Sequence, residues 1–364
     1  MTKQDSNHRP DGPLTASDDL PLHQTAETLY RVASDNPRFT ERWYFNLQRP
    51  DGSMIGICGG GFYPHTGTLE VYACLLIAGR QVNLRQRVTE FDRMRLDSAD
   101  SVTFAISEPM RTWTMKAHGS EFEFDLTFAA AQQSYLFPPF FVAADFPHQA
   151  TSLQVDTIQH FVQPGVVTGS MTIGGESTAV EARSFRDRTW GVRTARPRLH
   201  QWYVLHLDDG SSVNLIHQER ADGTVMVSHL ARVGAEGEIE TGVIDQHELT
   251  FDPVSRQLRQ GVYQAHTARG TVIQLRVDNL GEGVRLLGAG YTGDQGEASG
   301  LGRAQEDSWD LSDPDVVARV GKGTIDSPVR GTCTWGDSVA DGIGITETAI
   351  ARNHWRYGVQ LSGH

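Results

Sequence analysis

Apolar and polar residues alternate with a period of two along most of this chain, in short runs bounded by Gly, Pro, Asp or Ser. Such alternation is typical of strands, and no helical period lasts long enough for the helices that connect parallel strands. The pattern therefore predicts an antiparallel all-β protein built from barrels or sandwiches. The predicted strands lie at 43–47, 54–58, 69–77, 101–106, 111–116, 121–128, 201–207, 211–217, 223–233, 242–251, 266–277, 283–291 and 343–351.

The length of 364 residues predicts two domains, because a single hydrophobic core stops growing beyond about 250 to 300 residues. We expect similar antiparallel halves at residues 31–196 and 197–354. The other expected segments are a disordered leader with the start of a short helix (1–30, with helical spacing over 25–34), a second short helix (313–320) and a tail (355–364).

The charge balance excludes two classes of partner. The chain has 32 Lys and Arg against 45 Asp and Glu, a net charge of -13, whereas nucleic acids and anionic membrane surfaces need a basic face. Lysine occurs only at positions 3, 116 and 322, which leaves few candidates for a Schiff-base mechanism.

Cysteine use and the lack of long apolar stretches favour a cytoplasmic protein. Cys58, Cys74 and Cys333 are too few and too scattered for a disulfide framework or a thiolate zinc site. The first 22 residues lack the apolar core of a secretory signal, and no later stretch reaches the length of a membrane span. The sequence leaves a homodimer open.

The densest chemistry lies at the midpoint of the chain. Asp187 stands between Arg186 and Arg188, and Trp190 follows three positions later. If this segment is extended, the two arginines share one face and Asp187 lies on the other.

Two interpretations of Asp187 remain open. In the first, Asp187 is an ionised carboxylate that Arg183, Arg193 or another guanidinium holds at a domain junction. In the second, it lies at the edge of an apolar cavity with Trp190 as the wall, where desolvation keeps it protonated and able to deliver a proton.

The clearest hairpin lies at 201–217, with an Asp-Gly turn signal near its middle. If these two residues form the whole loop, Trp202 faces His217 and His206 faces Val213 across the strands. This face mixes aromatic and titratable side chains, so we expect it to line a cavity, with the Trp202 ring beside a buried His217. The alternative is a sheet face in contact with solvent.

A metal site on this hairpin face is a weaker interpretation. The face would carry His200, His206, His217 and Glu219. However, His206 and His217 are separated by two pair positions, which is too far for them to share an ion. We therefore expect no metal, and neutral histidines that line the cavity or are exposed.

The most apolar segment is 135–142, and it contains two prolines. Proline is excluded from central strands, so we interpret the segment as a loop that lays aromatic rings, Phe140 among them, over a cavity mouth or into a domain junction. Filling of the core is the alternative.

Five short blocks occur in a recognisable order: 41–45, 59–65, 160–163, 186–191 and 342–347. Together they resemble successive blocks of the carotenoid 1,2-hydratase and AttH-like proteins. This resemblance implies two lipocalin-like (calycin) domains in tandem and a deep apolar cavity. It also implies acid-assisted chemistry without an organic cofactor on long apolar or polyketide-derived substrates, with Asp187 and Trp190 facing the substrate.

We therefore expect a cofactor-independent lyase or isomerase. It would add or remove water, or close a ring, on a hydrophobic isoprenoid, steroid-like or polyketide-like molecule. Asp187 would donate or relay the proton, with His206 or His217 as the base. The alternatives are a non-catalytic carrier of a hydrophobic molecule and a metal-dependent hydrolase. The expected substrate-binding residues are Trp43, Tyr44, Trp190, Trp202, Arg193 and Phe140.

Overall fold

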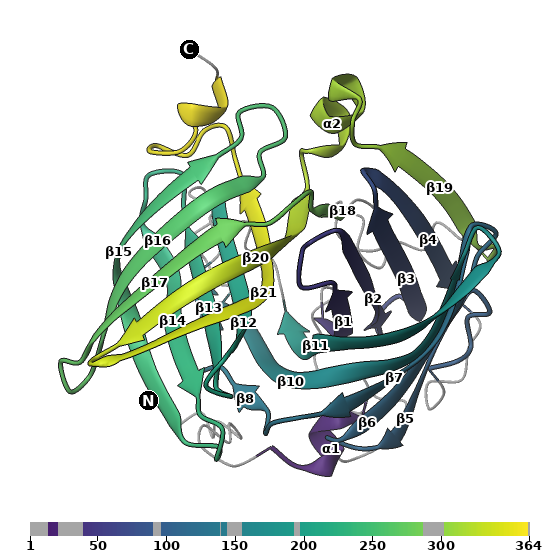
Figure 1. Ribbon diagram of the computed structural model, residues 1–364, viewed down its shortest axis with the longest axis horizontal. Helices are drawn as coiled ribbons and strands as arrows, with labels where there is room; N and C mark the ends of the chain where they lie inside the picture. Colours follow the sequence, from purple (N-terminus) through teal and green to yellow (C-terminus); the bar gives the residue numbers. More distant parts are fainter. Residues whose placement is uncertain are drawn as a thin grey trace.

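The computed structural model describes residues 14–20, 39–89, 96–138, 140–143, 155–192, 197–286 and 302–362. Within these segments most residues lie in strands, and the strand pairs are antiparallel. The prediction of an all-β protein with two domains is confirmed (Figure 1). The helix predicted over 25–34 lies outside the described residues. None of the helices in the described segments is long and apolar enough to cross a membrane.

The first sheet has 12 strands and curls into a half-barrel (Figure 1). Its order is β19-β4-β3-β2-β1-β11-β10-β7-β6-β5, and β8 and β9 pair with β10. The strands are β1 (Phe39–Gln48), β2 (Met54–Tyr63), β3 (Thr68–Ile77), β4 (Arg80–Val88), β5 (Val102–Glu108), β6 (Thr112–His118), β7 (Phe122–Ala130), β8 (Tyr135–Leu136), β9 (Phe140–Ala143), β10 (Val155–Ile173), β11 (Glu176–Val192) and β19 (Gln305–Asp310).

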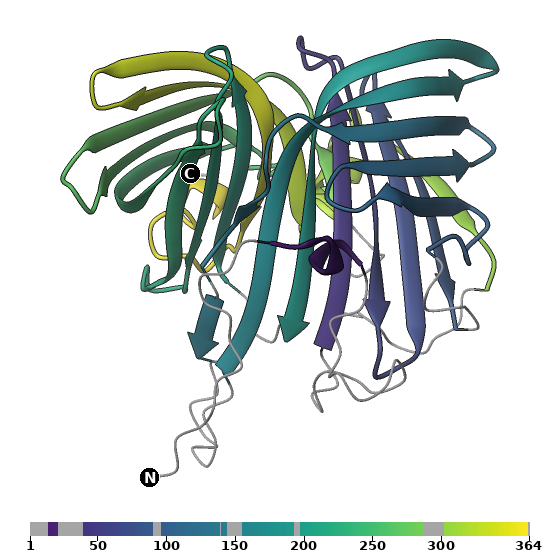
Figure 2. The same cartoon turned by 90° about the horizontal axis from the view of Figure 1, so that it is seen from below.

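The second sheet closes into an eight-stranded barrel, because β17 pairs with β20 as well as with β16. The barrel lies beside the half-barrel in both views (Figures 1 and 2). Its strands are β12 (Leu199–Leu207), β13 (Ser212–Glu219), β14 (Val225–Val233), β15 (Ile239–Phe251), β16 (Leu258–Thr267), β17 (Val272–Asn279), β20 (Thr324–Trp335) and β21 (Ser338–Ile350), and the short β18 (Val284–Leu286) pairs with β20.

Strand alternation divides the apolar side chains among three cores. Trp43 points into the half-barrel, where it packs with Phe104 and other rings. Its neighbour Tyr44 points the other way, into a core between the two sheets. Tyr203 and other residues of the second sheet fill the barrel interior. The core between the sheets joins the two domains through a large apolar contact, which favours a fixed arrangement of the domains.

One strand from the second half of the sequence belongs to the first sheet. Although β19 falls within the half predicted at 197–354, it pairs with β4 along the edge of the half-barrel. The backbone N–H of Leu311, just after β19, also donates to the carbonyl oxygen of Gly79 at 2.8 Å. Strand β19 therefore belongs to the first domain in space, although it lies in the second half of the sequence.

Two short helices test the predictions outside the strands. The predicted helix at 313–320 is confirmed as α2 (Pro314–Val320), whose N-cap Asp313 accepts a hydrogen bond from the N–H of Asp315. Within the segment predicted as a disordered leader and helix start, residues 14–20 contain α1 (Ala16–Asp19). Asp19 is fully buried there because its carboxylate pairs with Arg186 at 2.5 Å.

Candidate functional site

A row of side chains crosses the barrel face that looks toward the first sheet. The strand registers place Asp326 of β20 opposite Glu347 of β21, and Glu347 opposite Trp202 of β12. The row continues through Ile216 of β13 to His229 of β14. Directly opposed residues of paired strands point to the same face. Five strands thus combine acids, an indole and an imidazole in one line.

A second row lies on the facing side of the first sheet. Tyr44 of β1 is paired with Asp187 of β11, Asp187 with Val162 of β10, and Val162 with Tyr135 of β8. Tyr135 therefore lies at the domain junction, one of the two places predicted for the aromatic segment.

The two rows meet through hydrogen bonds and ring contacts. The Tyr44 hydroxyl donates to Oδ2 of Asp326 at 2.6 Å, and its ring meets that of Trp202 edge-on at 6.0 Å. At the other end of the rows, the Tyr135 hydroxyl is hydrogen-bonded to Nε2 of His229. We call Tyr44, His160, Asp187, His200, Trp202, Asp326 and Glu347 the interdomain cluster.

Asp326 is the most perturbed acid of the interdomain cluster. It is fully buried, and this burial raises the pKa of its carboxyl well above the usual range. The nearby carboxylates of Glu347 and Asp187 also raise the pKa, and the hydrogen bond from Tyr44 opposes the increase in part. Its Oδ1 is buried and meets no hydrogen-bond partner among the described residues. Asp326 is therefore set up to stay neutral and to hold a proton on Oδ1.

Asp187 has a histidine beside it and is partly open to solvent. Its side chain is 17% exposed, and its Oδ2 lies 3.6 Å from Nε2 of His160, which is longer than a hydrogen bond. The ring of His160 stacks between Phe137 and Trp202, at centroid distances of 5.1 and 6.2 Å. A small shift of either side chain would allow a proton to pass between Asp187 and His160.

The arginines of the central motif lie on the opposite face of β11, as the alternation predicts. Arg186 pairs with Asp19 at 2.5 Å, and Arg188 lies 3.3 Å from Glu41. Both guanidinium groups are buried on the half-barrel side. They bind these two acids, while Asp187 points toward the other domain.

A second acid and imidazole pair lies on the barrel side. Nε2 of His200 donates to Oε1 of Glu347 at 2.8 Å, while its Nδ1 accepts from the Gln218 side chain at 2.9 Å. These two contacts fix the tautomer, because an amide N–H can only donate. The Glu347 side chain is 18% exposed, so the cluster has a partly open carboxylate on each side of the buried Asp326.

The predicted pairing within the hairpin is wrong by one residue. Trp202 pairs with Ile216 and not with His217, and His206 pairs with Ser212 and not with Val213. The loop is residues 208–210, because the N–H of Leu207 donates to the carbonyl oxygen of Ser211 at 2.8 Å. Within it the side chain of Asp209 accepts from Ser211, and Gly210 adopts a left-handed φ of 82°. This arrangement suits the three-residue hairpin loop, in which a glycine takes the left-handed position.

The corrected register separates the predicted bases. His217 faces the barrel interior, where it lies beside Glu219 at 2.8 Å and away from Trp202. His206 stays on the face toward the first sheet, stacked on Phe185 at 3.9 Å, and its Nε2 donates to the carbonyl oxygen of Ser184 at 3.0 Å. Burial lowers the pKa of His206 to about 4. The imidazole beside Asp187 is therefore that of His160.

The predicted substrate-binding residues fall into three groups. Tyr44 and Trp202 belong to the interdomain cluster. Trp43 lies in the half-barrel core, and Trp190 contacts Phe161 on that same side of the sheet. Both are an odd number of positions from the residues facing the cluster, so alternation turns them away. Arg193 and the side chain of Phe140 lie outside the described residues.

Asp326, His160 and Glu347 were not among the site residues predicted from the sequence. His160 and Glu347 stand within the blocks that carry the family resemblance, which is a signal that could have found them. Asp326 has no such signal, since it occurs in an ordinary strand sequence. Only the register of β20 against β21 places it beside Glu347.

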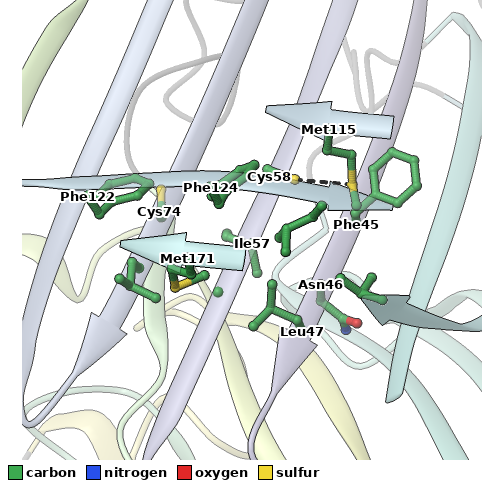
Figure 3. A pocket seen from close by; sticks show the side chains of 14 residues that line it. Phe45, Asn46, Leu47, Ile57, Cys58, Cys74, Met115, Phe122, Phe124 and Met171 are labelled. Carbon is green, nitrogen blue, oxygen red and sulfur yellow. Dashed lines mark hydrogen bonds between the residues drawn. The ribbon is translucent and has the colours of Figure 1, made fainter. Parts of the chain in front are cut away.

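A separate apolar pocket lies inside the half-barrel (Figure 3). Its lining includes Phe45, Cys58, Met115, Phe124 and Met171. The cavity volume is about 10 Å³, roughly what a single water needs. In this conformation the pocket does not have room for a long hydrophobic molecule.

Comparisons with known proteins agree with the fold. A protein from Nitrosomonas europaea (NE1406) that is described as AttH-like has 15% identity and a TM-score of 0.56, over 87% of this chain and 94% of its own. Kievitone hydratase from Nectria haematococca has 11% identity and a TM-score of 0.57, over 92% of each chain. These two structures confirm the predicted resemblance to AttH-like and hydratase proteins at the level of the fold.

The sequence comparisons give a family match. No curated protein matches by sequence. By sequence, residues 24–288 match the family described as domain of unknown function DUF7064, and the chain belongs to that family.

Proposed function

We propose that this protein is an enzyme of the hydratase or cyclase type. It would add or remove water, or close a ring, on a hydrophobic small molecule by acid–base catalysis at the interdomain cluster. The observation that carries the proposal is Asp326, a fully buried carboxyl with a raised pKa that is hydrogen-bonded across the domain junction to Tyr44. A carboxylic acid that stays neutral near pH 7 is a competent proton donor. Kievitone hydratase, which has a similar fold, supports the choice of hydration.

The chemistry of hydration assigns a role to each part of the cluster. The acid gives its proton to one carbon of a carbon–carbon double bond, and positive charge develops on the other carbon. Water then forms a bond to that second carbon, and a base takes the proton that this water loses. The rings of Trp202 and Tyr44, 6.0 Å apart, offer their electron-rich faces to the developing positive charge.

After the reaction Asp326 must regain its proton from solvent, which requires a group that lies near Asp326 and is also exposed to solvent. Asp187 meets this requirement, because it is near enough to Asp326 to raise its pKa and is 17% exposed. We assign Asp187, with His160 beside it, the role of proton relay. On the other side of Asp326, the exposed edge of Glu347 with its donor His200 provides a base for the attacking water.

The test uses kievitone, which the name of the hydratase neighbour identifies as its substrate, together with an acyclic carotenoid. Each compound is incubated with the protein in H₂¹⁸O, and mass spectrometry detects a product heavier by one labelled water. We expect Asp326→Asn and Asp187→Asn to lower turnover by about two to four orders of magnitude while ligand binding is retained. The matched control is Asp278→Asn, an exposed aspartate on β17 that pairs with Arg276.

The outcomes separate an enzyme from a carrier. Ring closure on either compound would leave mass unchanged and shift retention, so both signals are recorded. If the wild type binds the compounds without converting them, and Asp326→Asn binds equally well, the protein is a carrier and the proposed function is wrong. Full activity in Asp326→Asn would remove the acid from the mechanism.

A further inference from the structure

Three imidazoles converge on one carboxylate on the interior side of the barrel. Nε2 of His217 and of His247 lie 2.8 and 2.5 Å from Oε1 of Glu219. Nε2 of His354 lies 2.9 Å from the other oxygen, Oε2. Glu219, His217 and His354 are at most 5% exposed. Neither the proposed reaction nor the interdomain cluster uses this group.

Local geometry explains why these four side chains meet. His217 and Glu219 are two positions apart on β13, so they share one face. The strand β15 has a register irregularity between Ile244 and Gln246, and such a bulge changes which positions face inward. As a result His247 points to the same side as Ile244, although an odd number of residues separates them. His354 follows β21 in the segment that crosses the end of the barrel.

His354 acts on the carboxylate and cannot serve as a third imidazole ligand. Its Nδ1 accepts from the backbone N–H groups of Tyr357 and Arg356, at 3.2 and 3.4 Å. Because Nδ1 accepts, the proton of the neutral ring must be on Nε2, which donates to Glu219. His354 therefore fixes Oε2 and leaves Oε1 for other partners.

The contacts of His247 with Tyr357 allow the tautomer that a metal ligand requires. The Tyr357 hydroxyl lies 2.7 Å from Nδ1 of His247 and 3.2 Å from its carbonyl oxygen. The Tyr357 hydroxyl can donate either to Nδ1 or to that carbonyl oxygen; in the second case Nδ1–H donates to the phenol oxygen. The Nε2 lone pair of His247 then faces a carboxylate oxygen at 2.5 Å. In that tautomer a metal ion between Nε2 and Oε1 would replace the repulsion of the two lone pairs with two ligand bonds.

We propose that His217, His247 and Glu219 bind a divalent first-row metal ion such as Zn²⁺. Their ligand atoms all lie within 4.8 Å of one another, and two imidazoles with a carboxylate are an established donor set for zinc. Ligand bonds of about 2.0 to 2.2 Å require ligand atoms roughly 3.3 Å apart, so binding must separate the rings from the carboxylate by less than 1 Å. His354 and Tyr357 then act as the outer hydrogen-bond partners that orient the ligands.

The site would join the end of the chain to the barrel. The segment after β21 is held by backbone hydrogen bonds from Trp355 to Ala221 and from Ala351 to Arg198. Its His354 and Tyr357 contact a carboxylate of β13 and an imidazole of β15. A bound ion would link β13 to β15, and the hydrogen bonds of His354 and Tyr357 to its ligands would hold the segment after β21, so metal binding should stabilise the folded chain.

The experiment measures metal binding directly and does not depend on turnover. The purified full-length protein is stripped with chelator, titrated with Zn²⁺ by calorimetry and with Co²⁺ by visible absorption, and melted with and without the metal. We expect one Zn²⁺ per chain, a Co²⁺ spectrum and a higher Tm with metal. His247→Gln should remove binding, and His354→Gln should weaken it about 10- to 100-fold. The matched control is His266→Gln, an exposed histidine on β16 whose partner is Asp245.

Each outcome decides the proposal. The competing arrangement is a purely proton-linked cluster in which all three imidazoles donate N–H to Glu219. It predicts no Zn²⁺ binding by the wild type and a Tm that does not change with metal, and that result overturns the metal site whatever the variants do. Equal binding by the wild type and folded His247→Gln would also overturn it. Because the wild-type titration stands alone, failure of a variant to fold does not block the test.

Discussion

Replacing Asp326 with Asn should change how the stability of the protein depends on pH. The pKa of Asp326 is raised in the folded state, so between the unfolded value of about 3.9 and the folded value the folded chain holds one more proton than the unfolded chain. Stability then falls as pH rises, by about 1.4 kcal/mol per pH unit from this group. Asn carries no titrating proton, so the variant lacks this contribution.

The comparison requires urea unfolding of both proteins at several values between pH 5 and pH 7. The free energy of unfolding of the wild type minus that of Asp326→Asn should fall as pH rises over this range, by up to about 1.4 kcal/mol per pH unit. Asp278→Asn is the control. The pKa of Asp278 is shifted in the opposite direction from that of Asp326, because its hydrogen bonds with Arg276 lower it. Stability from Asp278 is complete above the unfolded pKa and is lost only as pH falls below it, so the control difference should be flat. A flat difference for Asp326 would refute the neutral acid.

Three further substitutions test individual contacts. Tyr44→Phe removes the hydrogen bond to Asp326; it should cost about 1 kcal/mol in urea unfolding and raise the pKa of Asp326 further, and an unchanged titration would contradict this. His206→Asn should leave turnover within a few-fold, because the pKa of His206 is about 4 and its Nε2 is used by a carbonyl; a large loss would restore it as a base. Arg186→Met should destabilise the chain by about 3 to 5 kcal/mol by leaving the Asp19 charge buried and unpaired, whereas an unchanged melting curve would show that this pair contributes little.

The fold was accessible from sequence because strand alternation is a local property. The alternation also placed Arg186 and Arg188 on one face of β11 and Asp187 on the other, and the structure has this arrangement. Helix α2 was predictable for a similar reason, since its Asp cap and its proline at the start are adjacent in sequence. The membership of β19 in the first sheet depends on contacts between distant segments, and no local pattern reports them.

The site was less accessible because it depends on register and on the facing of two sheets. One additional loop residue, Asp208, moves His217 from the cluster face to the barrel interior. Period-two patterns cannot distinguish the two faces of a strand that is buried on both, and β1 is such a strand, buried along its whole length. For this reason Trp43 and Tyr44 both looked like cavity residues, although only Tyr44 faces Asp326.

The central claim is that Asp326 carries a proton near neutral pH in the folded protein. Infrared difference spectroscopy of the wild type against Asp326→Asn at pH 7 tests this claim directly, in protein with ¹³C-labelled aspartate. Our account predicts a carbonyl stretch of a protonated carboxylic acid that shifts with the label, is present in the wild type and is absent from the variant. A difference spectrum that contains only the bands of an ionised carboxylate would contradict it.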